Sequence, residues 1–297
     1  MRSVFIEELV HLAALHDNIA LIVADLGFSV IEPFADRFPD RFINAGVAEQ
    51  NMTGLAAGMA SEGYHVFTYS IANFPTFRCA EQIRNDVAYH NLPVTIVSVG
   101  GGLAYGALGY SHHAVQDYAL IRCMPNMLIA APGDPMEARS CLRYLVDHPQ
   151  PSYLRLGRSG EPSFHLEPPV IEPGQWLKVS EDTNNPQGCL LATGATLGIA
   201  MESRRISKQY QNYDVYSLPL WGMAEKSIQT TQIEAHSKVV TLEDHLMDGG
   251  FGSWLLESSE GHVRDRIQIR ALDPAVCGAV ASQKALNELG GIFINQP

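Results

Sequence analysis

The sequence lacks the features that mark several classes of protein. No apolar run reaches the length of about 18 to 20 residues that a membrane-spanning helix needs, and Glu7 and Glu8 interrupt the start of the chain, where a secretion signal would be continuously apolar. Basic residues are also in the minority, because 20 lysines and arginines stand against 32 aspartates and glutamates, a formal net charge of −12. The electrostatic field of a protein with this negative net charge repels polyanions. We therefore expect a cytoplasmic protein without a nucleic-acid or membrane partner.

Cysteine is scarce as well. The five cysteines are an odd number, widely spaced, without a Cys-x-x-Cys pair, and mostly inside apolar segments. This pattern does not suggest disulfides, and we expect reduced thiols buried in the core. The residues are Cys79, Cys123, Cys141, Cys189 and Cys277.

The length and the apolar content favour a globular protein with roughly two domains at about 150 residues per domain: the chain has 297 residues, of which 46% are hydrophobic. Strand-like apolar runs alternate with helix-like periods, and the runs are continuous, which is typical of strands buried on both faces of a parallel sheet. The expected strands are Ile19–Ala24, Val66–Tyr69, Val94–Val99, Met127–Ala131, Ser152–Leu156, Cys189–Thr193, Tyr213–Leu218 and Lys238–Leu242. The expected helices are 47–62, 76–90, 134–146, 196–208, 250–259 and 279–289.

A change of composition predicts the domain boundary. Prolines gather with Gly, Ser and Asn between Gly157 and Gly188, and no long apolar run survives there. We expect an α/β domain over residues 1–160, a linker over 161–174 and a smaller α/β domain over 175–297. Such a fold by itself says little about chemistry.

Two segments of the first domain carry unusual side chains. Glu49 falls in the first turn of an expected helix among mostly apolar neighbours. It either has a chemical role or merely complements the positive end of the helix dipole. Phe74 and Phe77 lie at a strand-to-helix corner, where they either stack on a flat ring or belong to the core.

Two further segments follow expected strands. The loop from Gly100 to His113 holds five glycines and two tyrosines and leaves the carboxyl end of the sheet, where open α/β sheets bind ligands. His112, at its far end, is favoured as a general acid or base over a metal ligand, because no nearby Cys or carboxylate completes a zinc spacing. Arg158 ends another strand and suits a phosphate or carboxylate. Alternatively it forms an ordinary surface salt bridge.

Taken in order, these segments resemble the transketolase family of thiamine-diphosphate enzymes, specifically its pyrimidine-binding domain followed by its C-terminal domain. The likeness runs over nearly the whole chain. The matching landmarks are Ala24-Asp-Leu, Gly46-Val-Ala-Glu49-Gln, Phe74 running into Glu81-Gln-Ile-Arg84, Ser111-His112, Arg122-Cys-Met-Pro125-Asn, Pro132-Gly-Asp, Leu156-Gly-Arg158, Leu242-Glu-Asp-His245 and Gly249-Gly-Phe-Gly252.

The resemblance implies roles in cofactor binding. Glu49 matches the glutamate that hydrogen-bonds N1′ of the aminopyrimidine and favours the imino tautomer, whose N4′ takes the proton from thiazolium C2. The resulting ylide adds to a ketose carbonyl, the C2–C3 bond breaks, and an aldehyde accepts the two-carbon unit. Phe74, with Phe77 as the alternative, would hold the pyrimidine ring beside Arg78.

The resemblance also implies a substrate site. His112 matches a substrate-facing histidine, while Arg158 and Ser29 match positions that hold a sugar phosphate. Leu108 stands where relatives place an Asp that contacts the donor, and Gly100 stands where many carry a His. Because lost hydrogen-bonding groups alter discrimination strongly, the donor, the acceptor or both are expected to differ from the usual pentose phosphates.

One family feature is missing. Transketolases bind the diphosphate and Mg²⁺ with a separate domain that carries a Gly-Asp-Gly run, and this run does not occur in the sequence. We therefore expect a split enzyme in which a partner polypeptide supplies most of the diphosphate and Mg²⁺ site, assembled as an α2β2 heterotetramer. The chain itself is not expected to hold a metal.

Three alternatives remain open. The β subunit of a 2-oxoacid dehydrogenase and a deoxyxylulose-phosphate-synthase-like enzyme use related domains, although Ser111-His112 and Glu243-Asp-His245 favour a transketolase. A non-catalytic scaffold subunit is the third, and the intact Glu49 argues against it. We expect Glu243, Asp244 and His245 to form a hydrogen-bonded cluster at a strand end, and the second domain to mediate assembly.

Overall fold

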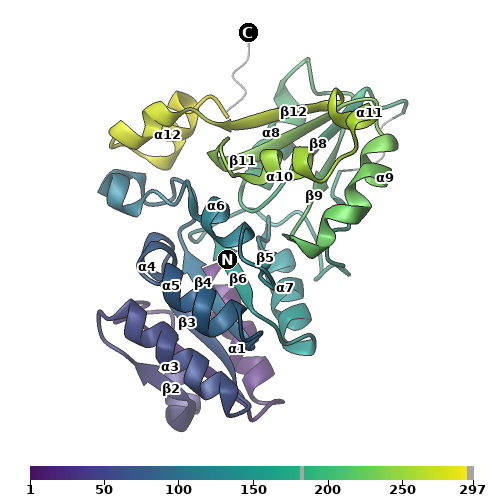
Figure 1. Cartoon of the computed structure of the whole chain (residues 1–297). Coiled ribbons are helices and arrows are strands. Elements are labelled where there is room, and N and C mark those ends of the chain that lie inside the picture. Colours follow the sequence, from purple (N-terminus) through teal and green to yellow (C-terminus); the bar gives the residue numbers. More distant parts are fainter. Residues whose placement is uncertain (181–183, 293–297) are drawn as a thin grey trace.

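The computed structural model describes residues 1–180 and 184–292 and contains two sheets of mostly parallel strands, stacked one above the other in Figure 1. The first sheet has the spatial order β10 (Leu220–Gly222), β5 (Leu128–Ala130), β6 (Ser152–Leu156), β4 (Val94–Val99), β3 (His65–Ile71), β1 (Ile19–Val23) and β2 (Phe42–Asn44). The second has the order β12 (Ile267–Leu272), β11 (Val239–Leu246), β8 (Gly188–Ala192), β9 (Tyr213–Ser217) and β7 (Leu177–Lys178). The predicted α/β class with two parallel-sheet units is confirmed.

The helices cover both faces of the sheets. They are α1 (Arg2–Ala13), α2 (Glu32–Arg37), α3 (Glu49–Ser61), α4 (Asn73–Phe77), α5 (Ala80–Gln82), α6 (Asp117–Arg122), α7 (Pro135–Asp147), α8 (Thr196–Ile206), α9 (Gln229–Glu234), α10 (Phe251–Glu257), α11 (Gly261–Arg264) and α12 (Gln283–Leu289). Shorter turns are η1 (Pro39–Arg41), the π-helix η2 (Ile83–Ala88), η3 (Gly106–Leu108), η4 (Tyr110–His112), η5 (Ala224–Ile228) and η6 (Pro274–Gly278).

The core of the first unit has two layers, one on each face of its sheet. Phe5 and Leu9 of α1 pack with Leu142 of α7 on one face. Met52 of α3 packs with Ile83 of η2 on the other. Strands β1, β4 and β6 are buried at every position, as expected for strands that lie between two helical layers. None of the helices in the described ranges combines the length and apolar character that a bilayer crossing requires.

Some boundaries differ from the prediction. The expected helix 76–90 is broken into α4, α5 and η2. Helical structure begins earlier, at Asn73, because the first turn of a helix accepts a proline: N–H groups there have no intrahelical partner, and Pro75 has no N–H. The expected helix 279–289 begins only at Gln283, because the Ser282 side chain caps it by accepting from the Ala285 N–H. Asp134 caps α7, because its side chain accepts a hydrogen bond from the Glu137 N–H.

The cysteine prediction is partly wrong. All five cysteines lie in the described residues and are free thiols. Cys79, Cys141 and Cys189 are buried, but Cys277 is half-buried and Cys123 is exposed at the end of α6. An apolar sequence neighbourhood therefore did not ensure burial at a helix end.

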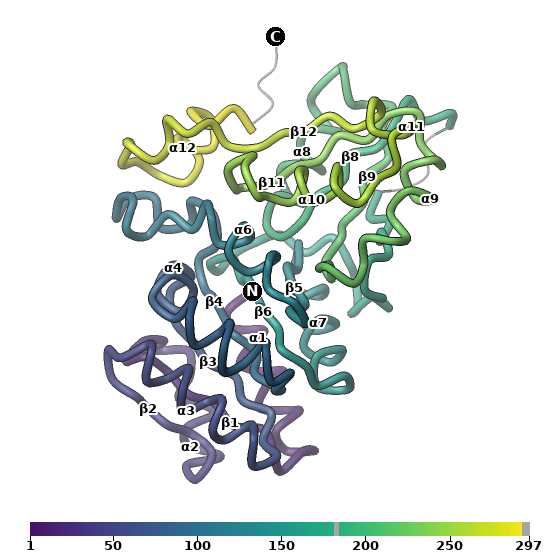
Figure 2. The backbone as a smooth tube through the Cα atoms, viewed as in Figure 1, coloured from purple at the N-terminus to yellow at the C-terminus, as the bar shows by residue number. Residues whose placement is uncertain are grey.

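The two units are joined by more than the linker. The backbone trace in Figure 2 passes from the lower unit to the upper one after β6, yet β10 returns and pairs antiparallel with β5 of the first sheet. This strand comes from the predicted second domain, so the two units share a sheet edge. The boundaries 1–160, 161–174 and 175–297 stay a prediction.

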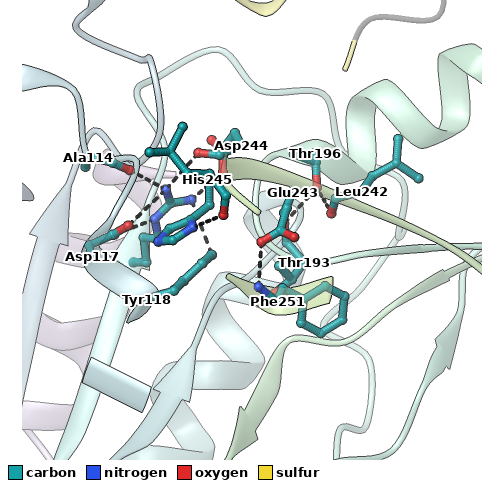
Figure 3. A network of polar contacts seen from close by, with 12 residues as sticks. Ala114, Asp117, Tyr118, Thr193, Thr196, Leu242, Glu243, Asp244, His245 and Phe251 are labelled. Carbon is teal, nitrogen blue, oxygen red and sulfur yellow. Dashed lines mark hydrogen bonds and ion pairs between the residues drawn. The ribbon is translucent and has the colours of Figure 1, made fainter. Parts of the chain in front are cut away.

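A buried ionic network also crosses the junction (Figure 3). Arg155, on β6, donates from Nε to Asp117 Oδ2 at 2.7 Å and from Nη1 to Asp244 Oδ1 at 2.5 Å. Its guanidinium lies 4.3 Å from the centroid of the Tyr118 ring. Burial alone would lower the pKa of Arg155, but the two carboxylates outweigh it and raise the pKa well above its usual range. The network therefore holds a permanent cation between the units.

The expected cluster at the end of β11 is present. Glu243 accepts from the N–H groups of Phe251 and Gly252, and its burial raises its pKa to about 8. His245 stacks on Tyr118 with ring centroids 5.4 Å apart, and burial lowers its pKa to about 4. Together with Asp244, these residues are buried and hydrogen-bonded, which agrees with a structural role.

Candidate active site

The carboxyl ends of four parallel strands bring the candidate residues to one edge of the first sheet. Strands β1, β3, β4 and β6 run parallel, so the segments that follow them leave the sheet on the same side. These segments carry Ser29, Phe74, His112 and Arg158, respectively. This edge is where open α/β sheets bind their ligands.

Glu49 begins α3 close to this edge. The turn before it is fixed by Asn44, whose side-chain oxygen accepts from the N–H groups of Asp25 and Gly46, while Gly46 adopts φ +72°, a left-handed conformation that favours glycine. The Glu49 side chain is 4% exposed, and its Oε1 accepts from Arg78 Nη1 at 2.9 Å. A buried carboxylate at a helix N-terminus is thus paired with a single cation.

Arg78 connects Glu49 to an aromatic pair. Its guanidinium lies 4.2 Å from the centroid of the Phe74 ring. The rings of Phe74 and His112 make a T-shaped contact with centroids 5.3 Å apart. Arg78 is itself 49% exposed. The planar guanidinium therefore rests on Phe74 while it donates to Glu49. Phe77, the alternative stacking residue, is 48% exposed at the end of α4.

Two cavities meet at Arg78. One, of about 400 Å³, is lined by residues 47–51 and Arg78. The other, of about 360 Å³, is lined by Asn73, Phe74, Phe77, Arg78, Tyr110, Ser111 and Gln116. The arginine side chain thus separates a space beside Glu49 from a space beside Phe74 and the loop after β4.

The two adjacent histidines of this loop have different surroundings. His112 is half-buried, and its Nδ1 lies 3.0 Å from Ser111 Oγ. Burial lowers its pKa, with smaller contributions from His113 and Arg78, so His112 is neutral at pH 7. His113 is buried, and its Nε2 lies 3.3 Å from the Gly106 carbonyl oxygen inside the loop. Only His112 of this pair borders the candidate site.

Ser29 and Arg158 lie at the same edge but outside the contacts that join Glu49, Arg78, Phe74 and His112. Both are exposed, and Ser29 adopts φ +65° with its N–H donating to Glu32 Oε1. The Arg158 carbonyl accepts from the Arg2 N–H at 3.4 Å. The backbones of Arg2 and Arg158 are therefore neighbours at this edge of the sheet.

Arg2 was not among the site residues predicted from the sequence. It begins α1, its charge lies close to the Tyr69 hydroxyl, and its buried Nε has no hydrogen-bond partner in the described structure. Burial raises the pKa of that hydroxyl to about 12. The apolar spacing of Phe5, Leu9 and Leu12 could have revealed the helix and placed the arginine at its start.

At two positions of the loop after β4, Gly100 and Leu108, the sequence differs from the family that it resembles, and the structure explains the first of these differences. Gly100 has φ +81°, and a Cβ there would lie 2.1 Å from the Tyr105 ring. Tyr105 thus fills the space that a side chain at position 100 would need. Leu108 is 59% exposed, so its side chain is available to whatever lies over the loop.

The cluster best suited to a metal lies elsewhere. In the part of the chain that the structure describes, Asp134, Glu137 and His165 offer ligand atoms within 4.8 Å of one another. However, Asp134 Oδ2 already accepts from the N–H groups of Phe164 and His165 and from His165 Nδ1. Burial raises the pKa of Glu137 to about 7. These contacts attach the linker to α7 and leave little coordination capacity for an ion.

Comparisons with known proteins agree with this arrangement. Residues 1–162 match the family model of the transketolase pyrimidine-binding domain. The chain is 36% identical over 264 residues to a putative transketolase C-terminal section of Methanocaldococcus jannaschii, covering 86% of this chain and 81% of that protein. It is 31% identical over 273 residues to one of the subunits of an apulose-4-phosphate transketolase of Phocaeicola vulgatus, covering 90% and 86%. A solved split-gene transketolase, described as an inactive β4 tetramer, superposes with a TM-score of 0.81 at 28% identity and 98% and 93% coverage.

Proposed function

Because this chain belongs to the transketolase family, we propose that it is the pyrimidine-binding subunit of a two-component transketolase. The complex would transfer a two-carbon ketol unit from a phosphorylated ketose to an aldose. The similar length of the M. jannaschii and P. vulgatus relatives, of which the chain covers 81% and 86%, supports a subunit of this size. The observation that carries the proposal is the buried Glu49 carboxylate facing a planar group that rests on Phe74.

The residues present fit an aminopyrimidine. The Arg78 guanidinium is flat, donates a hydrogen bond to Glu49 and stacks on Phe74, and these are the requirements of an aminopyrimidine ring. Thiamine diphosphate would supply a thiazolium that stabilises a carbanion. Glu49 would hold the proton at N1′ of the ring, and Phe74 would support its face. Arg78 would have to leave this position, which its 49% exposure permits.

The remaining residues suit a sugar phosphate. Neutral His112 can donate or accept a hydrogen bond at a substrate hydroxyl or carbonyl. Arg158 and Ser29 would bind the phosphate. The P. vulgatus transketolase, named for apulose 4-phosphate, supports a phosphorylated substrate.

A partner subunit would complete the site. Val47, Phe77 and Tyr110 line the two cavities and are 73%, 48% and 49% exposed. Leu108, in the loop that carries His112, is 59% exposed. Together they expose more apolar surface than an isolated active site needs. The split-gene structure described as an inactive β4 tetramer supports a requirement for a second chain. That chain would bind the diphosphate and Mg²⁺, in an α2β2 complex.

Reconstitution tests this function. The chain would be combined with a candidate diphosphate-binding subunit and titrated with thiamine diphosphate and Mg²⁺, and ketol transfer and carbon dioxide release would be measured. We expect transfer only from the complex, without carbon dioxide. Carbon dioxide from a 2-oxo acid would instead assign a dehydrogenase or synthase-like reaction. Turnover by the chain alone would refute the split arrangement.

Replacing Arg158 with alanine is expected to raise KM for phosphorylated sugars about 10- to 100-fold, because a charge-assisted hydrogen bond contributes about 1.5–3 kcal/mol. KM would be measured by steady-state kinetics of the complex. Arg205→Ala is the matched control, since Arg205 pairs with Glu202 on α8 in the second unit. An equal rise in KM for non-phosphorylated substrates would remove Arg158 from a phosphate-binding role.

A further inference from the structure

The loop that carries His112 is closed at its base. Gly102 and Ala114 exchange two backbone hydrogen bonds of 2.9 Å, so residues 103–113 form a closed excursion after β4. The first unit contacts one side of this loop. Asn73 of α4 donates from Nδ2 to the carbonyl oxygens of Ser111 and His113 at 3.2 and 2.8 Å.

The second unit contacts the other side of the loop. Leu103 and Val115 are fully buried in a small core formed with Leu272, Val276 and Leu286. In Figure 1 the yellow segment around α12 lies directly above the loop after β4. The fit is close, because a Cβ at Gly106 would lie 2.3 Å from Leu286 Cδ1. The apolar core of the loop therefore depends on residues more than 150 positions later in the chain.

The ionic network holds the base of the same loop. Arg155 donates from Nη2 to the Ala114 carbonyl at 2.8 Å, and from Nη1 to Asp244 of the second unit. Asp244 in turn packs on the loop backbone, where a Cβ at Gly102 would lie 2.0 Å from its Oδ2. Leu246 adds a backbone hydrogen bond of 2.9 Å from its N–H to the Val115 carbonyl. Figure 3 shows Ala114 and Asp244 in the same network of polar contacts.

From these contacts we propose that the second unit is the positioning element of the substrate-facing loop, with Leu286 and Asp244 as positioning residues for His112. This inference rests on the proposed function for its kinetic consequence. Asn73 alone would leave the loop attached on one side. The contacts with Leu286 and Asp244 fix the other side of the loop, and with it the position of the His112 ring against Phe74.

A pair of leucines on α12 provides the test. Leu286 is 1% exposed and packs on the loop, whereas Leu289, one turn later, is 50% exposed. In the reconstituted complex, Leu286→Ala is expected to speed hydrogen exchange of the amides at 102–115 and to raise KM for the sugar substrate about tenfold, because a displaced His112 loses its hydrogen bond to the bound sugar. The dissociation constant of thiamine diphosphate should stay within twofold. Leu289→Ala should change none of these, and Leu286→Met should restore KM.

Two further variants approach the same contact from the loop. Gly106→Ala adds a methyl group against Leu286 and should reproduce the exchange and KM effects, while Gly278→Ala adds one in open space and should not. Unchanged exchange at 102–115 in both Leu286→Ala and Gly106→Ala would overturn the proposal, as would a loss confined to kcat. Should the wild-type complex lack ketol transfer, the proposed function fails, and the exchange measurement still decides whether the second unit orders the loop.

Discussion

Replacing Glu49 with glutamine is expected to lower kcat of the reconstituted complex by about 10²–10⁴-fold, the range typical of a group that transfers or holds a proton in the transition state. Glutamine preserves the shape of the side chain and can still accept from Arg78, but it cannot carry the negative charge that Glu49 brings into a buried position. The measurement is steady-state turnover at saturating thiamine diphosphate and Mg²⁺.

Glu81→Gln is the matched control for this substitution. Glu81 is an exposed glutamate in α5, next to the segment that carries Arg78, and its loss should leave kcat unchanged. The melting temperature of both variants should stay close to that of the wild type, which separates a chemical effect from unfolding. Unchanged turnover in the Glu49→Gln complex would support the scaffold subunit in place of the catalytic one.

Strands were predicted best where they lie in the middle of a sheet and are buried on both faces. The runs Val94–Val99 and Ser152–Leu156 are strands with those bounds, because β4 and β6 lie in the middle of the sheet and both of their faces are buried. Strand β10 was missed, since three residues paired with a distant β5 leave no local periodicity. Strand β12 was also missed, because it forms one edge of the second sheet and most of its residues are only partly buried.

The candidate site could be predicted in part. The resemblance selected Glu49, Phe74, Arg78 and His112, and the structure brings these four side chains into one series of contacts. Their roles in binding and catalysis stay a prediction. The position of the Arg78 guanidinium between Glu49 and Phe74 could not be predicted, because it depends on how α3 and α4 pack.

Contacts between distant segments were beyond the sequence analysis. The support of the loop by Leu286 joins residues far apart in the chain, and nothing in the glycine-rich loop itself indicates a partner. Gly102 and Gly106 are informative in retrospect, since each faces a side chain of the second unit at a distance that excludes a Cβ. Glycines in such a loop can therefore report close packing as well as turns.

Replacing Arg155 with methionine is expected to cause the largest loss of stability, about 3–5 kcal/mol in the free energy of unfolding, because breaking a buried ion pair leaves uncompensated charge. Asp117 and Asp244 would face each other in the junction, where both are almost fully buried. At about 2–4 °C per kcal/mol for a domain of this size class, the melting temperature should fall by about 10 °C. Differential scanning calorimetry of the wild type and variant measures this.

The pH dependence and a compensated variant make the cause of this loss testable. Burial raises the pKa of Asp244 even beside Arg155. Without Arg155, the Asp244 carboxylate should therefore bind a proton more readily in the folded than in the unfolded protein, and the loss of stability should be smaller at pH 5 than at pH 8. Adding Asp117→Asn and Asp244→Asn to Arg155→Met should recover much of the loss. Arg205→Met, which breaks an exposed pair, should leave the melting temperature unchanged. A deficit that is independent of pH and persists in the triple variant would attribute the loss to packing around Tyr118 instead of to the two carboxylates.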